Sequence, residues 1–149
     1  MSIKKVCVIG LGYIGLPTAS TLASHGVAVL GVDVNPRILE TLKSGEIHIH
    51  ERGLRQAYRS ARDSGKFALA AQPAEADAFL IAVPTPFYEG KFGEFNGRTY
   101  KLADMGAVIS AAESIVPFLR KGNLVLLEST SPPRTTIDLL APILRRSGL

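Results

Sequence analysis

The amino-acid sequence predicts an α/β fold in which helices cover both faces of one doubly wound parallel sheet. Short apolar runs alternate with helix-forming stretches along all 149 residues, which is typical of consecutive βα units. The first apolar run, residues 4–10, also ends in a Gly-x-Gly-x-x-Gly turn that opens an Ala- and Leu-rich stretch. The length suits one domain, residues 1–149, with a sizeable core.

Each predicted element follows from a local pattern. Strands are expected at the short apolar runs, which are residues 4–10, 27–32, 67–70, 76–83 and 123–128. Helices are expected near residues 14–25, 36–43, 52–63, 104–119 and 133–146. Pro36 suits the first turn of its helix. Residues 87–102 are rich in Gly, Tyr and Lys and show no periodicity, so we expect a loop or a mobile flap there.

The glycine turn predicts a dinucleotide-binding site. Gly10 permits a tight strand-to-helix turn, Gly12 lets the backbone approach a pyrophosphate, and Gly15 lets the helix pack close to the strand. The helix begins around Tyr13 and Ile14, where unpaired N–H groups and the helix dipole attract phosphate. The alternative is a glycine-rich turn that binds nothing.

Asp33 ends the second apolar run, eighteen residues beyond Gly15, and predicts which dinucleotide is bound. At this position a carboxylate accepts hydrogen bonds from the adenosine ribose and repels a 2′-phosphate, so NAD is favoured over NADP. Arg37, four residues further on, weakens this preference because an arginine can receive a 2′-phosphate.

The predicted sheet is smaller than that of a full dinucleotide-binding fold. About five strands are expected, whereas the fold commonly has about six in the order 3-2-1-4-5-6. We therefore expect a Rossmann-type sheet that is truncated after about five strands, without a substrate domain and with some apolar surface left uncovered.

Two further turns follow the fourth and fifth predicted strands and should reach the same edge of the sheet as the glycine turn. Thr85 lies between Pro84 and Pro86 in the first turn, and Thr130 lies in a Ser-Thr-Ser-Pro-Pro segment in the second. These hydroxyls can contact the ribose or the diphosphate, or order a water. They can equally be ordinary turn formers that cap the last helix, and spacing alone leaves both open.

The composition argues against several other classes of protein. The net charge of +4 is mild, and the arginines that share one predicted helix face, Arg52, Arg55, Arg59 and Arg62, indicate a solvated surface rather than a nucleic-acid site. No apolar run approaches the ~18 residues of a membrane span, so no membrane partner is expected. No signal peptide precedes the first strand, which favours a cytoplasmic location.

The cysteine and the paired histidines carry no predicted chemistry. Cys7 is the only cysteine, which excludes an internal disulfide, and we expect it to be a small buried hydrophobe in the first strand. His48 and His50 are two residues apart, but no further His, Cys or Asp cluster completes a metal site, so no metal is expected.

The ordered motifs resemble the NAD-binding domain of the UDP-glucose/GDP-mannose 6-dehydrogenase family over nearly the whole chain. The matching parts are residues 10–17, Asp33, and residues 45–54, 83–86 and 128–132. Within the family, residues 45–49, 76–87 and 127–132 look most similar to the members that act on UDP-N-acetyl-D-mannosamine.

The resemblance implies a four-electron oxidation of a sugar C6 alcohol to a carboxylate with two NAD⁺, in which a cysteine traps the aldehyde and water hydrolyses the thioester. It also implies that Thr85 contacts NAD. Thr130 would lie near the nicotinamide and help to place water, as an accessory catalytic residue. The family's catalytic Cys, Lys and Asn have no match in this chain, and Cys7 does not match the nucleophile. We therefore expect a UDP-sugar substrate and a homo-oligomer for a longer enzyme, and weak NAD binding without turnover for these residues alone.

Two alternatives remain open at this point. The substrate can be UDP-glucose, UDP-N-acetylglucosamine or GDP-mannose, or the chain can be a stand-alone NAD-binding module without catalysis. The reading frame beyond codon 149 distinguishes the second alternative from an enzyme. The chain also departs from the family pattern at Arg134, where the family usually has glycine, so we expect a side chain to crowd or recharge that turn. Residues 87–102 are also longer than expected for the family.

Overall fold

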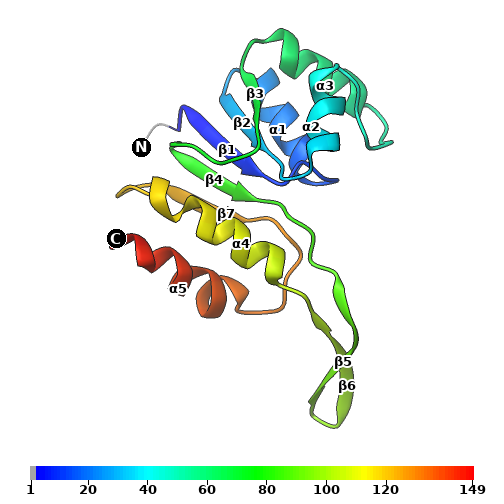
Figure 1. Ribbon diagram of the computed structural model, residues 1–149, viewed down its shortest axis with the longest axis vertical. Coiled ribbons are helices and arrows are strands. Elements are labelled where there is room, and N and C mark those ends of the chain that lie inside the picture. The colour runs from blue at the N-terminus through cyan, green and yellow to red at the C-terminus, as the bar shows by residue number, and fades with distance from the viewer. Residues whose placement is uncertain (1–2) are drawn as a thin grey trace.

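A computed structural model describes residues 3–149 and contains the predicted parallel sheet. Residues 1 and 2, with which the predicted domain and the N-terminal segment begin, lie outside the described residues. The five strands are β1 (Lys5–Ile9), β2 (Ala28–Val32), β3 (Phe67–Ala70), β4 (Ala78–Ile81) and β7 (Leu124–Leu127). Their order is β3-β2-β1-β4-β7, so the direction of strand addition reverses beside β1 (Figure 1). This reversal confirms the Rossmann-type topology and leaves a crevice at the carboxyl ends of the strands.

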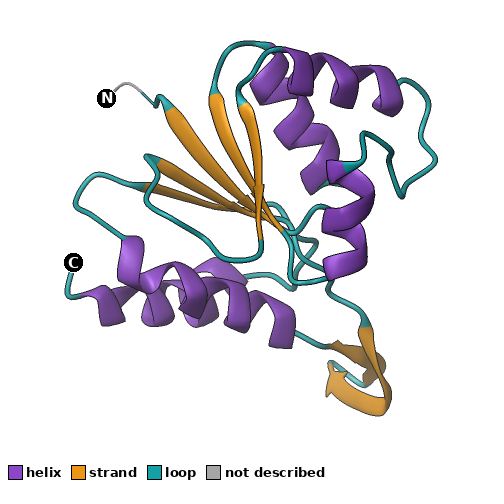
Figure 2. Cartoon of the chain, turned by 45° about the horizontal axis from the view of Figure 1, so that its top comes forward, coloured by secondary structure: helices purple, strands orange, loops and turns teal. Residues whose placement is uncertain are grey.

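Helices cover both faces of the sheet, as predicted (Figure 2). One face carries α1 (Gly15–Ser24), α2 (Pro36–Lys43) and α3 (Leu54–Asp63), and the other carries α4 (Gly106–Ile115) and α5 (Ala141–Leu144). All five lie close to the predicted helices, and residues 45–50 contain no helix or strand. The four predicted arginines are exposed, although Arg52 precedes α3 rather than belonging to it.

The sheet separates two core layers, and the central strand β1 contributes side chains to both. Val6 and Val8 pack with α1, α2 and α3, whereas Cys7 and Ile9 pack with α4 and the C-terminal helical segment. A strand that is buried on both faces needs apolar residues at consecutive positions, which is why β1 reads as a continuous apolar run. Cys7 is completely buried, so the prediction of a small buried hydrophobe is confirmed.

The prediction of a loop over residues 87–102 is wrong. β5 (Phe87–Phe95) and β6 (Arg98–Ala103) form an antiparallel hairpin that projects from the body of the molecule (Figure 1). Asn96 and Gly97 form its turn with φ of 50° and 71°, which is typical of the two-residue turns that join hairpin strands. Phe92 and Tyr100 lie on opposite faces and are 56% and 49% exposed. Because neither face is buried, the strands lack the apolar alternation by which a strand is recognised.

The C-terminal helical segment begins at Thr136, later than predicted. It consists of a π-helical turn at Thr136–Leu140, then α5, and then a 3-10 turn at Arg145–Ser147. Pro142 lacks the N–H that an α-helix would donate to the carbonyl of Asp138, and the wider π turn directly precedes it.

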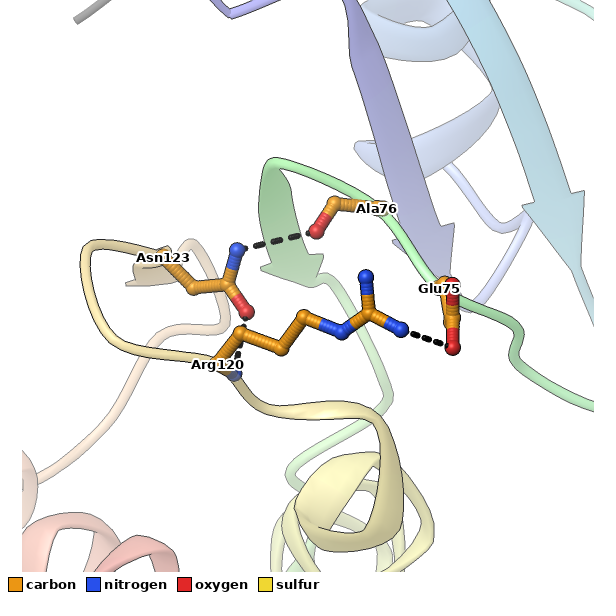
Figure 3. A network of polar contacts seen from close by, with 4 residues as sticks. All are labelled: Glu75, Ala76, Arg120 and Asn123. Carbon is orange, nitrogen blue, oxygen red and sulfur yellow. Dashed lines mark hydrogen bonds and ion pairs between the residues drawn. The ribbon is translucent and has the colours of Figure 1, made fainter.

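A polar network joins the turn before β7 to the segment before β4, at the end of the sheet opposite the crevice (Figure 3). The Asn123 amide donates to the carbonyl of Ala76 at 2.9 Å and accepts from the backbone N–H of Arg120 at 2.7 Å. Arg120 also pairs with Glu75. These contacts set the position of β7 at the edge of the sheet.

The outer strand β7 carries the uncovered apolar surface that was expected. Leu124 and Leu126 are 40% and 41% exposed, whereas Val125 and Leu127 pack into the core beneath α4. No helix within residues 3–149 is long and apolar enough to cross a membrane.

Candidate dinucleotide-binding site

The glycine turn joins β1 to α1 at the carboxyl edge of the sheet, and two of its glycines are required by contact. Gly10 has a φ of 90°, and a Cβ there would lie 2.5 Å from the carbonyl oxygen of Ala82. A Cβ on Gly15 would lie 1.8 Å from the carbonyl oxygen of Gly10. Both distances are far below a van der Waals contact, so no side chain fits at either position. The turn can therefore close only with glycine at both ends.

Gly12 has a different environment, because a Cβ there would meet no atom within 4 Å. The helix α1 starts at Gly15, its N-cap residue Ile14 makes no capping side-chain hydrogen bond within the described chain, and Tyr13 and Ile14 are 67% and 54% exposed. Unpaired N–H groups and the positive end of the helix dipole therefore face open space beside Gly12. A pyrophosphate group fits this arrangement of donors.

Asp33 follows β2 and is fixed by two backbone groups. Its Oδ2 accepts a hydrogen bond from the N–H of Leu11 at 2.9 Å, and its Oδ1 accepts from the N–H of Asn35 at 2.8 Å. The carboxylate is partly buried, and each oxygen keeps a further lone pair for a ligand. It is thus oriented to accept hydrogen bonds from two neighbouring hydroxyls. Arg37 is exposed in the first turn of α2, four residues beyond Asp33. Its backbone N–H donates a hydrogen bond to Oδ1 of Asn35.

An apolar cleft of about 420 Å³ lies directly beside Asp33. Val34, Val83, Pro84 and small residues of α4 line it. A cleft of this chemistry next to a fixed carboxylate suits a flat, weakly polar base such as adenine. The small residues were missed from the sequence. Their signal was present, because Ala107, Ser110, Ala111 and Ser114 recur at helical spacing on one face of α4.

The turns after β4 and β7 are brought together, as the parallel topology predicted. The Thr85 hydroxyl donates to the carbonyl oxygen of Thr130 at 2.6 Å, and the Thr130 side chain is exposed. The Ser129 hydroxyl donates to the carbonyl oxygen of Val83 at 2.7 Å. Thr130 can therefore reach a ligand, whereas Ser129 points into the protein. The buried role of Ser129 was not found from the sequence.

Arg134 adopts the left-handed backbone conformation with a φ of 70°, which explains why a glycine suits this position. Its side chain turns toward the helical segment that follows, where Nε lies 2.8 Å from Oδ2 of Asp138. The ion pair with Asp138 offsets the positive charge that Arg134 was expected to bring to this turn. The same hydrogen bond raises the pKa of the Arg134 guanidinium.

Cys7 is buried in β1, whereas His48 and His50 lie outside the helices and strands of the described chain. Burial raises the pKa of the Cys7 thiol to about 11, so the thiolate needed for nucleophilic attack is scarce at neutral pH. His48 and His50 lie between α2 and α3, and residues 3–149 contain no group of three His, Cys, Asp or Glu side chains that could hold a metal ion.

Fold and site together define a dinucleotide-binding domain of the doubly wound class. Residues 4–148 match the family described as the UDP-glucose/GDP-mannose dehydrogenase family, NAD binding domain. The chain belongs to this family, and its cofactor is NAD.

Individual relatives agree with this assignment. The chain is 50% identical over 134 residues to a UDP-N-acetyl-D-mannosamine dehydrogenase of Methanococcus maripaludis, a match that covers 90% of this chain and 30% of that protein. The structure is similar to that of the UDP-N-acetyl-mannosamine dehydrogenase of Staphylococcus aureus, with a TM-score of 0.87, 42% identity, and coverage of 97% of this chain and 33% of that one. A UDP-glucose dehydrogenase of Pyrobaculum islandicum gives a TM-score of 0.81 at 36% identity and covers 98% and 33%. The chain thus spans about a third of the length of these relatives.

Proposed function

We propose that this chain is the NAD-binding domain, residues 1–149, of a nucleotide-sugar 6-dehydrogenase. The enzyme would oxidise the C6 alcohol of UDP-N-acetyl-D-mannosamine to the uronic acid with two NAD⁺. The observation that carries the proposal is the Asp33 carboxylate, which two backbone hydrogen bonds fix beside an open glycine turn. The chain that contains it is 50% identical to a UDP-N-acetyl-D-mannosamine dehydrogenase.

The residues at the carboxyl edge of the sheet would each bind a different part of the cofactor. The turn formed by Gly10, Gly12, Tyr13, Ile14 and Gly15 would hold the pyrophosphate. Asp33 would accept from the adenosine ribose, with Arg37 at its rim and Pro84 against the adenine. NAD⁺ would then extend toward β4 and β7, where Thr85 and Thr130 lie. When bound, NAD⁺ supplies the hydride acceptor.

The chemistry at the sugar needs groups that these residues do not provide. A thiol that traps an aldehyde must reach the nicotinamide, but Cys7 is buried in β1 and its thiol has a raised pKa. We therefore propose that the 149 residues alone bind NAD⁺ weakly and do not turn over a sugar. The proposed enzyme is cytoplasmic and homo-oligomeric, and Thr130 is its accessory residue for placing water.

The substrate is the least constrained part of the proposal. The enzymes named for UDP-N-acetylmannosamine are 30–50% identical to this chain, and the UDP-glucose enzyme of P. islandicum is 36% identical; the highest identities, 42–50%, belong to the first group. This ranking favours UDP-N-acetyl-D-mannosamine over UDP-glucose, and it leaves UDP-N-acetylglucosamine and GDP-mannose as further candidates.

A chimeric enzyme tests the function. The chain replaces the matching third of the S. aureus enzyme, and in a second chimera it replaces that of the P. islandicum enzyme. We expect the first to form two NADH per UDP-N-acetylmannosamine and the second to be less active on UDP-glucose, because contacts between the domains have to match. An Asp33→Ala version of the first chimera serves as the control for cofactor binding. NAD⁺ binding without turnover in either chimera would favour a non-catalytic module.

A further inference from the structure

Ser129 joins the two turns that flank the far half of the crevice. It follows β7, is only 9% exposed, and its hydroxyl donates to the carbonyl oxygen of Val83 at 2.7 Å, 46 residues away in sequence. Its backbone N–H donates to the carbonyl oxygen of Ile81 at 3.2 Å, so both polar hydrogens of the residue bind the segment that ends β4. The side chain therefore holds one turn against the other and does not face a ligand.

The contact continues from Val83 to the glycine turn. A Cβ on Gly10 would lie 3.1 Å from Cγ1 of Val83 and 2.9 Å from the carbonyl carbon of Ala82. The segment that Ser129 holds is thus the segment against which the glycine turn closes. On the other side of Ser129, the carbonyl of Thr130 accepts the hydroxyl of Thr85, which leaves the exposed Thr130 hydroxyl in a defined place.

Strand order determines which half of the cofactor lies here. Asp33 at the end of β2 accepts the adenosine ribose, and the pyrophosphate lies at the glycine turn after β1. Because β4 and β7 follow β1 in the opposite direction from β2, the nicotinamide half must extend over their ends. The turn after β7, and the part of the turn after β4 that carries Thr85, would therefore lie beneath the nicotinamide half, whereas Val83 and Pro84 also line the adenine cleft.

We propose that Ser129 is a positioning residue for the nicotinamide. Its buried hydrogen bond to Val83 fixes the turn after β7 and thereby fixes the position of the neighbouring Thr130 hydroxyl relative to the cofactor. The inference rests on the orientation of NAD⁺ given under the proposed function. Without the hydroxyl, the carbonyl of Val83 loses its partner and the two turns can separate. Asp33, which would hold the adenosine ribose, is anchored by Leu11 and Asn35 and not by this bond, so ADP-ribose should depend on the bond less than NAD⁺ does.

Two ligands that differ only at the nicotinamide separate this role from general destabilisation. The 149-residue chain is titrated by calorimetry with NAD⁺ and with ADP-ribose, and thermal unfolding verifies that each variant is folded. We expect Ser129→Ala to reduce the preference for NAD⁺ over ADP-ribose by roughly 5-fold, the equivalent of one neutral hydrogen bond, with a smaller loss of affinity for ADP-ribose than for NAD⁺. Ser129→Thr keeps the hydroxyl and should restore the preference.

Ser64→Ala is the matched control, because the Ser64 hydroxyl also donates to a backbone carbonyl, that of Ala61 at 2.6 Å, but at the end of α3. It should change neither affinity. Equal weakening of both ligands by Ser129→Ala, or no change in either, overturns the inference. Asp33→Ala should weaken both ligands equally. If it leaves both unchanged, the proposed orientation fails, independently of the outcome at Ser129.

Discussion

Asp33 and Leu11 are joined by a hydrogen bond of 2.9 Å from the backbone N–H of Leu11 to Oδ2 of the carboxylate. The acid that is expected to select NAD therefore also holds the glycine turn in its closed form. The proposed recognition of the ribose and the shape of the glycine turn therefore depend on the same side chain. A ligand that meets this carboxylate finds the phosphate donors already in place.

Asp33→Ala should consequently weaken NAD⁺ binding by about 10- to 100-fold, the equivalent of losing hydrogen bonds to a charged group. It should also narrow the difference between NAD⁺ and NADP⁺, because the carboxylate no longer repels the 2′-phosphate. Calorimetric titration of both dinucleotides measures the two effects. Asp63→Ala is a suitable control, since Asp63 is exposed at the end of α3. Unchanged affinity in the Asp33 variant would remove its assignment.

Arg134 allows backbone strain to be separated from ion pairing. Arg134→Ala keeps a side chain at a φ of 70° but loses the pair with Asp138, so its melting temperature should fall by about 3 °C. Arg134→Gly loses the same pair but relieves the backbone, so its melting temperature should stay within about 1 °C of the wild type. Circular dichroism during heating distinguishes them. Equal losses in both variants would show that the backbone at this position is unstrained.

Ser20 is a position where the chain can be stabilised. Its hydroxyl is fully buried on α1, and it has no hydrogen-bond partner within residues 3–149. Ser20→Ala removes an unsatisfied polar group and adds helix propensity, so the free energy of unfolding in urea should rise by about 1 kcal/mol. Ser24→Ala, where the hydroxyl is exposed and donates to the carbonyl of Thr21, should show no gain of this size. A loss of stability at Ser20 would mean that packing around the hydroxyl outweighs its desolvation.

Cys7 should make stability depend on pH in the alkaline range. Burial raises the pKa of its thiol from 9.0 to about 11, so the folded state retains a proton that the unfolded state releases. The stabilising contribution of this group is complete below pH 9 and is lost as the pH rises toward 11. Urea unfolding across this range should show the decline, and Cys7→Ala should lack this component.

The same burial predicts slow reaction of the thiol. At neutral pH the thiolate fraction is about 100-fold lower than for a free cysteine, because each pKa unit is a factor of ten. A disulfide reagent should therefore modify Cys7 only when the chain opens, and added urea should accelerate the reaction. Rapid labelling of the native chain would contradict the buried position of β1.

Sequence reasoning succeeded where a feature depends on neighbouring residues. Gly10 and Gly15 close a single strand-to-helix turn, and β1 is apolar at consecutive positions because both its faces are covered. The hairpin was missed although Asn96-Gly97 is a strong turn signal, because neither of its faces is buried and the usual alternation is absent. Ser129 could not be assigned, since its partner Val83 lies 46 residues away and only the folded sheet brings them together. The left-handed conformation of Arg134 likewise has no signal in its own residue type.

The hairpin offers a practical attachment point for probes. Its two strands leave the body side by side, and the N–H of Asp104 donates to the carbonyl of Pro86 at 2.7 Å where they begin and end. This closure isolates the tip from the turn that carries Thr85, so additional residues between Asn96 and Gly97 need not disturb the cofactor crevice. A fluorescent or affinity tag inserted at the tip would lie away from the sheet, so it could report on the domain without blocking the carboxyl edge where the cofactor is proposed to bind.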